Sequence, residues 1–362
     1  SGKYARRRTR SDPAWCPRKA PAPRRTNTGS AEMDDIITLD YGSGGKKTAA
    51  LIDEIIIPEL GNNALNALGD GAILDGQLAF STDSFVVDPL FFPGGDIGKL
   101  CVCGTVNDLA MCGAEPKYLS LALIIEEGLP TESLRRIVAS IKAAAEAAGV
   151  AVVTGDTKVV ERGRGDGVYI TTSGIGVVRH PGLGPERMRP GDAVLISGTA
   201  GDHGAAVMLA RDALMEGEIR SDCAALNGLV RAVLESGAQV RVLRDPTRGG
   251  VATTLCEFAE SAALGIELDE AAIPVRRDVS AACALLGLDP LYCANEGKML
   301  AVVAAKDAER ALAAMRSVPE GKNAAIIGRV ISERPGKVVL RTAMGGGRIL
   351  QKLAGAQLPR IC

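Results

Sequence analysis

Short apolar runs of β-rich composition alternate with stretches of helical period from residue 34 almost to the end of the chain. This alternation predicts layered α/β or α+β domains, in which helices cover sheets. Only 3% of the residues are aromatic and 43 are glycine, so we expect a core of Ala, Val, Leu and Ile and many tight turns. With 362 residues and 46% hydrophobic content, the chain is long enough for roughly two domains.

The first domain is predicted from the runs between residues 36 and 178. Its clearest helix follows Pro130, where Thr131 is placed to cap the helix and Gly149 to end it. One face of this helix is apolar: Leu134, Ile137, Val138 and Ile141. A strand predicted at residues 150–154 then delivers a loop, residues 155–158, to its C-terminal end, where α/β proteins tend to bind ligands.

Residues 180–190 are rich in Pro and Gly and predict a linker, with the domain boundary near residue 185. Beyond it we predict regular elements at residues 193–197 (strand), 251–262 (helix), 299–303, 325–330 and 338–341 (strands). The chain thus divides into a basic extension expected to be disordered (1–33), an N-terminal domain (34–184), a C-terminal domain (185–350) and a flexible tail ending in Cys362 (351–362).

The basic residues gather at the front of the chain. Residues 1–30 hold nine Lys and Arg side chains and one acid, although the formal net charge of the whole chain is −1. An RNA-binding arm or a targeting peptide would have this composition. However, Met33 directly precedes the first strand-like run, which favours an extension upstream of the natural start. We therefore expect no nucleic-acid partner.

The cysteines and the apolar runs argue against disulfide-rich, zinc-binding and membrane proteins. Nine scattered cysteines without a CxxC pair predict neither a disulfide framework nor a zinc site, and indicate a reducing cytoplasm. No apolar run approaches the ~18 residues that span a bilayer, and no signal peptide opens the chain, so no membrane partner is expected. Because there are only two histidines, carboxylates, lysines, cysteines and backbone N–H groups must carry the chemistry.

Two glycine-rich turns precede predicted helices and could bring backbone N–H groups to phosphates: Gly42, Ser43, Gly44 and Gly45, and then Arg248, Gly249 and Gly250. The first is not a Walker loop, because Asp40 stands where that pattern needs its first glycine and Lys47 where it needs Ser or Thr. A glycine-rich turn by itself is more often only a turn.

Acidic residues lie near predicted strand ends: Asp83, Asp88, Asp108, Asp156, Asp245 and Glu296. Carboxylate oxygens are suitable ligands for Mg²⁺ that shares the phosphates of a nucleotide. Each acid alone is more often a helix cap or turn former, but six together indicate a site. Lys158 offers a cation for a transferring phosphate, with a solvated surface lysine as the alternative.

The chain ends in Cys362, which is not a prenylation box because no residue follows it. The segment from residue 353 onward shows no helix or strand pattern. It could extend about 30 Å at ~3.3 Å per residue, enough to enter a cleft or present the thiol to another protein.

Nine motifs in this order resemble the HypE family of hydrogenase maturation proteins, within the aminoimidazole ribonucleotide synthetase (PurM-like) superfamily: residues 42–45 (GSGG), 81–84 (STDS), 88–95 (DPLFFPGG), 106–110 (VNDLA), 155–160 (GDTKVV), 201–204 (GDHG), 248–250 (RGG), 295–298 (NEGK) and 359–362 (PRIC). The resemblance covers nearly everything from residue 34 onward. It implies a two-domain PurM-like architecture, with N-terminal sheets that pair in a homodimer barrel and ATP bound in the cleft.

The resemblance also implies a reaction. A partner carbamoyltransferase would load a carbamoyl group onto the sulfur of Cys362, and ATP would drive its dehydration to a thiocyanate. The cyanide would then pass to an iron-carrying maturation scaffold, as a ligand for the iron centre of a [NiFe]-hydrogenase.

The resemblance carries roles over to residues of the matching motifs. Mg²⁺ and phosphates would be held by acids of four motifs: Asp83, Asp108, Asp156 and Asp245. Thr157 would help to bind ATP, and Lys158 would neutralise charge that develops at the γ-phosphate. Glu296 would take the amide proton. For His203, contact with substrate and a structural role both stay open.

Two other readings remain. One keeps the fold but assigns a free small-molecule substrate, as in synthetases or kinases of the same superfamily. The other is a non-catalytic, nucleotide-binding assembly subunit whose tail docks partners. If the substrate is a free small molecule, ATP turnover does not need Cys362, whereas the dehydratase cannot form product without it. A chemically modified Cys362 would exclude the assembly subunit.

Overall fold

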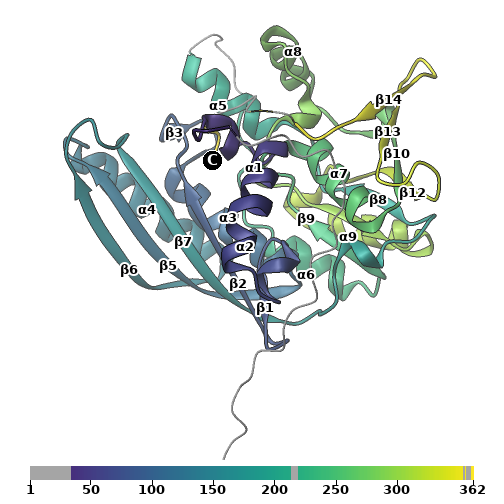
Figure 1. Ribbon diagram of the computed structural model, residues 1–362, viewed down its shortest axis with the longest axis horizontal. Coiled ribbons are helices and arrows are strands. Elements are labelled where there is room, and N and C mark those ends of the chain that lie inside the picture. Colours follow the sequence, from purple (N-terminus) through teal and green to yellow (C-terminus); the bar gives the residue numbers. More distant parts are fainter. Residues whose placement is uncertain (1–33, 213–218, 354, 356–359) are drawn as a thin grey trace, which may run out of the picture.

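The computed structural model describes residues 34–212, 219–353, 355 and 360–362 (Figure 1). The predicted basic extension, residues 1–33, lies outside the described residues, as do residues 354 and 356–359 of the predicted tail. The described chain forms two α/β units, each built on one main sheet, which confirms the predicted fold class.

The N-terminal sheet contains, in spatial order, β1 (Ala72–Leu74), β2 (Leu78–Phe85), β7 (Val168–Val178), β5 (Ala114–Glu126) and β6 (Ala151–Val160). Only β5 and β6 run parallel to each other. Two helices, α3 (Ile97–Met111) and α4 (Thr131–Ala148), cover one face of this sheet. A small ribbon of β3 (Phe91–Phe92) and β4 (Gly95–Asp96) leads into α3.

The other face of this sheet is open and apolar. Phe80 pairs with Ile175, and Ile175 pairs with Tyr118, so the three side chains form one row across the sheet. All three are exposed, at 40%, 41% and 52%, while their neighbours along the strands point toward α3 and α4. This row is called the outer row below.

Helix α4 agrees with the predicted helix in position but not in every detail. It begins at Thr131, which is its first residue rather than its cap, and ends at Gly149 in the left-handed conformation. Ile137 and Ile141 are buried as predicted, whereas Val138 is 44% exposed. Val138 follows Ile137 by one residue, and the roughly 100° turn per residue carries it away from the buried face.

Strand β6 is longer than predicted, and the predicted site loop at residues 155–158 is therefore wrong. The strand continues to Val160 because it pairs in parallel with β5 as far as Glu126. Gly155 permits this close pairing, since a Cβ there would lie 2.2 Å from the carbonyl oxygen of Leu121. The residues from Asp156 to Lys158 consequently belong to an exposed edge strand.

The C-terminal sheet contains, in spatial order, β14 (Gly347–Leu350), β13 (Val338–Arg341), β10 (Gly265–Asp269), β12 (Ala325–Ile331), β8 (Ala193–Ile196), β11 (Leu300–Val303) and β9 (Val240–Arg244). One face packs on α7 (Gly250–Ala262), and the other on α6 (Asn227–Glu235) and α9 (Ala308–Arg316). Both faces of β8 and β11 are buried, which explains why these strands are continuous apolar runs. The predicted second-domain strands and helix are confirmed within one or two residues.

The two units share buried surface along α3, which packs against elements of both (Figure 1). Nearly all of α3 is buried, so it is apolar on every side rather than amphipathic. Helix α1 (Lys46–Leu51), a π-helical turn (Ile52–Ile56) and α2 (Ile57–Leu60) run along this junction beside α3. Helices α5 (Asp202–Asp212) and α8 (Arg277–Leu286), which pack on each other, lie at the top of the view in Figure 1.

Candidate active site

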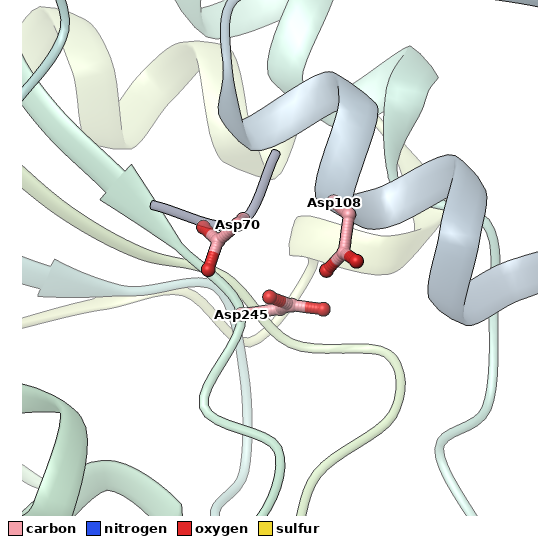
Figure 2. A group of neighbouring side chains, drawn as sticks. All are labelled: Asp70, Asp108 and Asp245. Carbon is pink, nitrogen blue, oxygen red and sulfur yellow. The ribbon is translucent and has the colours of Figure 1, made fainter. Parts of the chain in front are cut away.

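Three carboxylates meet where the two units join (Figure 2). Asp70 precedes β1, Asp108 lies in the last turn of α3, and Asp245 directly follows β9. One oxygen atom from each of them lies within 4.8 Å of the other two. The sequence predicted Asp108 and Asp245 for a metal site, but it did not predict Asp70.

Burial and mutual repulsion disfavour the charged form of these carboxylates. Burial, followed by the charge of Asp245, raises the pKa of Asp108 well above its usual value. Burial, followed by the charge of Asp70, raises the pKa of Asp245 to about 8. Asp70 forms an ion pair with Arg244 at 2.5 Å, yet burial still raises its pKa. One arginine therefore does not balance the negative charge of this cluster.

The cluster suits a hard divalent cation such as Mg²⁺. Oδ2 of Asp245 is buried and has no hydrogen-bond partner among the described residues. The hydroxyl of Ser81 has one proton for two acceptors, Oδ2 of Asp108 at 2.7 Å and the carbonyl oxygen of Asp70 at 3.0 Å. Three carboxylates with unused acceptor capacity are the donor set that Mg²⁺ prefers.

The end of the chain lies in the same junction. The backbone N–H of Val86 donates to a carboxyl oxygen of Cys362 at 3.0 Å, and that of Asp88 donates to the carbonyl of Arg360 at 3.2 Å. Ile361 is 2% exposed and belongs to the N-terminal core. Residues 360–362 are thus docked against the segment that follows β2, while the predicted mobility of the tail remains a prediction.

Two predicted site residues act directly on the thiol of Cys362. Burial, followed by the charge of Glu296, raises the pKa of this thiol, whereas Arg248 opposes the rise. Glu296 is 2% exposed, its Oε1 has no hydrogen-bond partner in the described part of the chain, and burial raises its pKa well above the usual range. Asp83, on β2, adds to the same negative environment. The docked thiol is therefore neutral.

The two predicted glycine-rich turns come together around Arg248. Its Nη1 donates to the carbonyl of Gly42 at 3.0 Å, and a Cβ at Gly44 would lie 3.1 Å from the Cβ of Arg248. A Cβ at Gly45 would lie 2.4 Å from the carbonyl oxygen of Leu353, which accepts the N–H of Lys46 at 3.0 Å. Ser43 closes this turn through its hydroxyl, which donates to the carbonyl of Asp40 at 2.7 Å.

Gly249 and Gly250 begin α7 with φ values of +79° and +63°, which L side chains rarely adopt. The two turns therefore lie against each other at the junction, and their phosphate-binding role stays a prediction.

The structure does not bring Asp156, Thr157 and Lys158 to this site within one chain. Asp83 pairs across the sheet with Thr172 at one edge, whereas β6 is the opposite edge, with β7 and β5 between them. Asp156 lies beside Ala122 on the outer face, while Asp83 points inward toward α3. Nζ of Lys158 instead pairs with Asp156 at 2.6 Å, and both side chains are exposed.

Asp70 could have been found from sequence only through its setting, Gly69-Asp70-Gly71 before a short apolar run. The run forms only three residues of strand, so no strand end was predicted there. Two residues of α5 also lie near the tail: His203, for which the sequence left substrate contact and a structural role open, and Arg211, which was not predicted.

The comparisons with known proteins agree with this arrangement. Family models for AIR synthase related protein match residues 68–178 with their N-terminal domain and residues 189–341 with their C-terminal domain. Carbamoyl dehydratase HypE of Azotobacter vinelandii is 52% identical over 332 residues, which cover 90% of this chain and 97% of the relative. The chain belongs to the HypE family. The predicted resemblance and the PurM-like fold are thereby confirmed.

Solved HypE structures share the fold over nearly their whole length. A crystal structure of HypE in complex with ATP has a TM-score of 0.77 and 51% identity, and the match covers 90% of this chain and 99% of that chain. A HypE–HypF complex gives a TM-score of 0.80 at 49% identity, covering 84% and 100%. Among the described residues of this HypE family member, no helix is long and apolar enough to cross a bilayer.

Proposed function

We propose that this chain uses ATP to dehydrate an S-carbamoyl group on its own Cys362 to a thiocyanate, which supplies cyanide for the iron centre of a [NiFe]-hydrogenase. The observation that carries the proposal is the docked end of the chain, which places the Cys362 thiol under the electrostatic influence of Glu296, Arg248 and Asp245. Relatives at about 50% identity are named carbamoyl dehydratases, and one HypE was solved with ATP.

The reaction needs activation of an amide oxygen, which is a poor leaving group. The thiocarboxamide oxygen attacks the γ-phosphorus of ATP, and ADP leaves. Loss of both N–H protons and cleavage of the C–O bond then give the nitrile and inorganic phosphate. The net change converts thiocarboxamide and ATP into thiocyanate, ADP, phosphate and a proton.

Some residues at the junction would bind the metal ion, and others would bind the phosphates of the nucleotide. Asp70, Asp108 and Asp245 would hold Mg²⁺, which neutralises charge on the phosphates when bound, and Asp83 would complete this acidic wall. Backbone N–H groups of residues 42–45 and 248–250, with the Arg248 guanidinium, would receive the phosphates.

Glu296 would accept an amide proton. Its raised pKa makes it a stronger base once it is ionised, and lets it retain the proton that it accepts. The charge of Arg248 would favour the ionised form of Glu296.

Asp156, Thr157 and Lys158 remain assigned to ATP and its γ-phosphate, with Asp156 as a further metal ligand. The side chains of Asp156 and Lys158 lie on the outer face of the sheet, whereas Thr157 between them points to the opposite face. The role of Asp156 and Lys158 therefore requires a second copy of the chain to supply them. The proposed partners are a carbamoyltransferase that loads Cys362, as the HypE–HypF complex suggests, and an iron-carrying scaffold that receives cyanide, in the cytoplasm.

Intact mass spectrometry tests the proposal on the full chain. After incubation with the carbamoyltransferase and carbamoyl phosphate, the protein should gain the mass of one carbamoyl group. Addition of Mg-ATP should then remove the mass of one water. The matched control, Cys362→Ala, should bind ATP and show neither change.

The alternative readings predict different masses. ATP turnover that continues with a small-molecule substrate in Cys362→Ala would favour a superfamily kinase or synthetase. ATP binding without any change at Cys362 in the wild-type protein would favour an assembly subunit.

A further inference from the structure

Helix α5 presents two side chains to the main chain of the docked tail. Nε2 of His203, in the first turn, lies 2.8 Å from the carbonyl oxygen of Ile361. Near the other end, Nη2 of Arg211 donates to the carbonyl of Arg360 at 2.7 Å and to that of Asp88 at 2.6 Å. One helix of the C-terminal unit therefore holds the last carbonyl groups of the chain against the N-terminal unit.

The hydrogen-bond network fixes which nitrogen of His203 carries the proton. A carbonyl oxygen only accepts, so Nε2 must be the donor to Ile361. Nδ1 lies 2.8 Å from Oγ of Ser221, and that oxygen already accepts the backbone N–H of Cys223 at 3.0 Å. The hydroxyl proton of Ser221 is then free to go to Nδ1.

The surroundings keep this imidazole neutral and oriented. His203 is fully buried, and burial lowers its pKa, against an opposing effect from Asp222. The ring of Phe92 packs edge-on against the imidazole, with 5.4 Å between centroids. A neutral ring with one fixed donor is suited to hold a backbone carbonyl rather than to exchange protons.

The contacts flank Cys362 without touching its sulfur. His203 holds the carbonyl on one side of this residue, and the N–H of Val86 holds its carboxyl group on the other. Arg360 adds a third attachment, since its Nε donates to the carbonyl of Val86 at 3.1 Å and its guanidinium pairs with Asp166. The hydrogen bonds of residues 361 and 362 use main-chain atoms, so none of them depends on the group that the sulfur carries.

We propose that His203 and Arg211 are positioning residues that hold the tail in the junction and so keep the sulfur of Cys362 near the carboxylates and Arg248. The inference rests on the proposed function for the reaction that follows, but tail docking itself can be measured without it. Neither residue touches the reacting atoms.

Two rates test the inference on the full chain. The first is the alkylation rate of Cys362 by iodoacetamide under native conditions, read on the peptide that follows Lys352 after cleavage at lysine. The second is the rate of ATP-dependent water loss from the carbamoylated protein. The first reports tail docking alone, and the second reports its use in the reaction.

His203→Leu removes the donor at similar size, while His203→Gln keeps an N–H donor near the position of Nε2. We expect His203→Leu to raise alkylation of Cys362 about tenfold, as for loss of one buried hydrogen bond, and to slow water loss at least tenfold. His203→Gln should restore both rates to within about threefold of wild type.

Arg211→Met, at the other end of α5, should also raise alkylation, which keeps the test decisive if His203→Leu does not fold. His180→Leu and Arg231→Met are matched controls and should leave both rates unchanged.

Wild-type alkylation rates in both His203→Leu and Arg211→Met would overturn the inference, and so would faster alkylation with unchanged water loss. If the wild-type protein never loses water but the alkylation pattern holds, the proposed function fails while tail holding by α5 is supported.

Discussion

At the scale of single residues, the junction gathers acids whose pKa burial raises. Glu296 is the most buried of those that act on the thiol, and burial, followed by Asp245 and Asp83, raises its pKa. A carboxyl group with no hydrogen-bond partner for Oε1 is costly unless a ligand or substrate meets it. The amide protons of a carbamoylated Cys362 would meet that need.

Glu296→Gln should separate ATP binding from dehydration. Glutamine keeps the shape of the side chain but is not a base, so water loss should slow at least 100-fold, within the usual range for a lost general base. Carbamoylated protein should accumulate, and ATP affinity should stay within about threefold, as followed by intact mass and by calorimetry. Glu309→Gln, on the exposed side of α9, is the control. Water loss near the wild-type rate in Glu296→Gln would remove Glu296 from the reaction.

The sequence predicted residue types better than residue groups. Asp83, Asp108, Asp245 and Glu296 were found because acids near strand ends suit metal and phosphate chemistry. Asp156 is grouped with these acids by the prediction of a strand that ends at residue 154. The strand instead continues to Val160, and the side chain of Asp156 lies on the outer face of the sheet. No local pattern marks where this strand ends, since its length depends on how far β5 extends beside β6.

At the scale of elements, the start of α7 shows how backbone geometry builds the junction. Gly250 has a φ of +63°, and a Cβ there would lie 2.5 Å from the carbonyl oxygen of Leu291 and 2.6 Å from that of Cys293. The close approach holds the Arg248 turn against the segment that carries Glu296. The helix itself was predictable from its apolar spacing, whereas this tertiary contact was not.

Gly250→Ala should therefore destabilise the protein. A left-handed φ and two backbone contacts together should lower the free energy of unfolding by about 2–4 kcal/mol. Urea unfolding followed by circular dichroism measures the change. Gly228→Ala in α6 is the matched control, because nothing lies within 4 Å of its Cβ position and its φ is not in the left-handed region. There, alanine should be neutral or slightly stabilising. Equal stability of both variants would contradict this account of the turn.

At the scale of the whole molecule, the outer row and strand β6 share one uncovered sheet face. Phe80, Ile175 and Tyr118 expose apolar surface there, and Asp156 and Lys158 lie on the same face toward the edge. Contiguous apolar surface of this kind marks an interaction site. The predicted homodimer would cover it and bring the edge strand β6 of one copy, with Asp156 and Lys158, toward its partner.

Disruption of this face should therefore abolish both dimer and reaction. By light scattering at micromolar concentration, the wild-type protein should have a mass of about twice 37.5 kDa. Phe80→Glu, which puts a charge into the outer row, should give a monomer. Leu285→Glu is the control on α8, since Leu285 is 65% exposed outside this face.

The Phe80→Glu variant also tests the need for two copies in the reaction. Since Asp156 and Lys158 of one chain face away from its own Asp83, the folded Phe80→Glu monomer should no longer remove water from the carbamoylated protein with ATP. A monomeric wild-type protein would contradict the homodimer, and an active Phe80→Glu monomer would show that one chain suffices and that β6 has no part in the site.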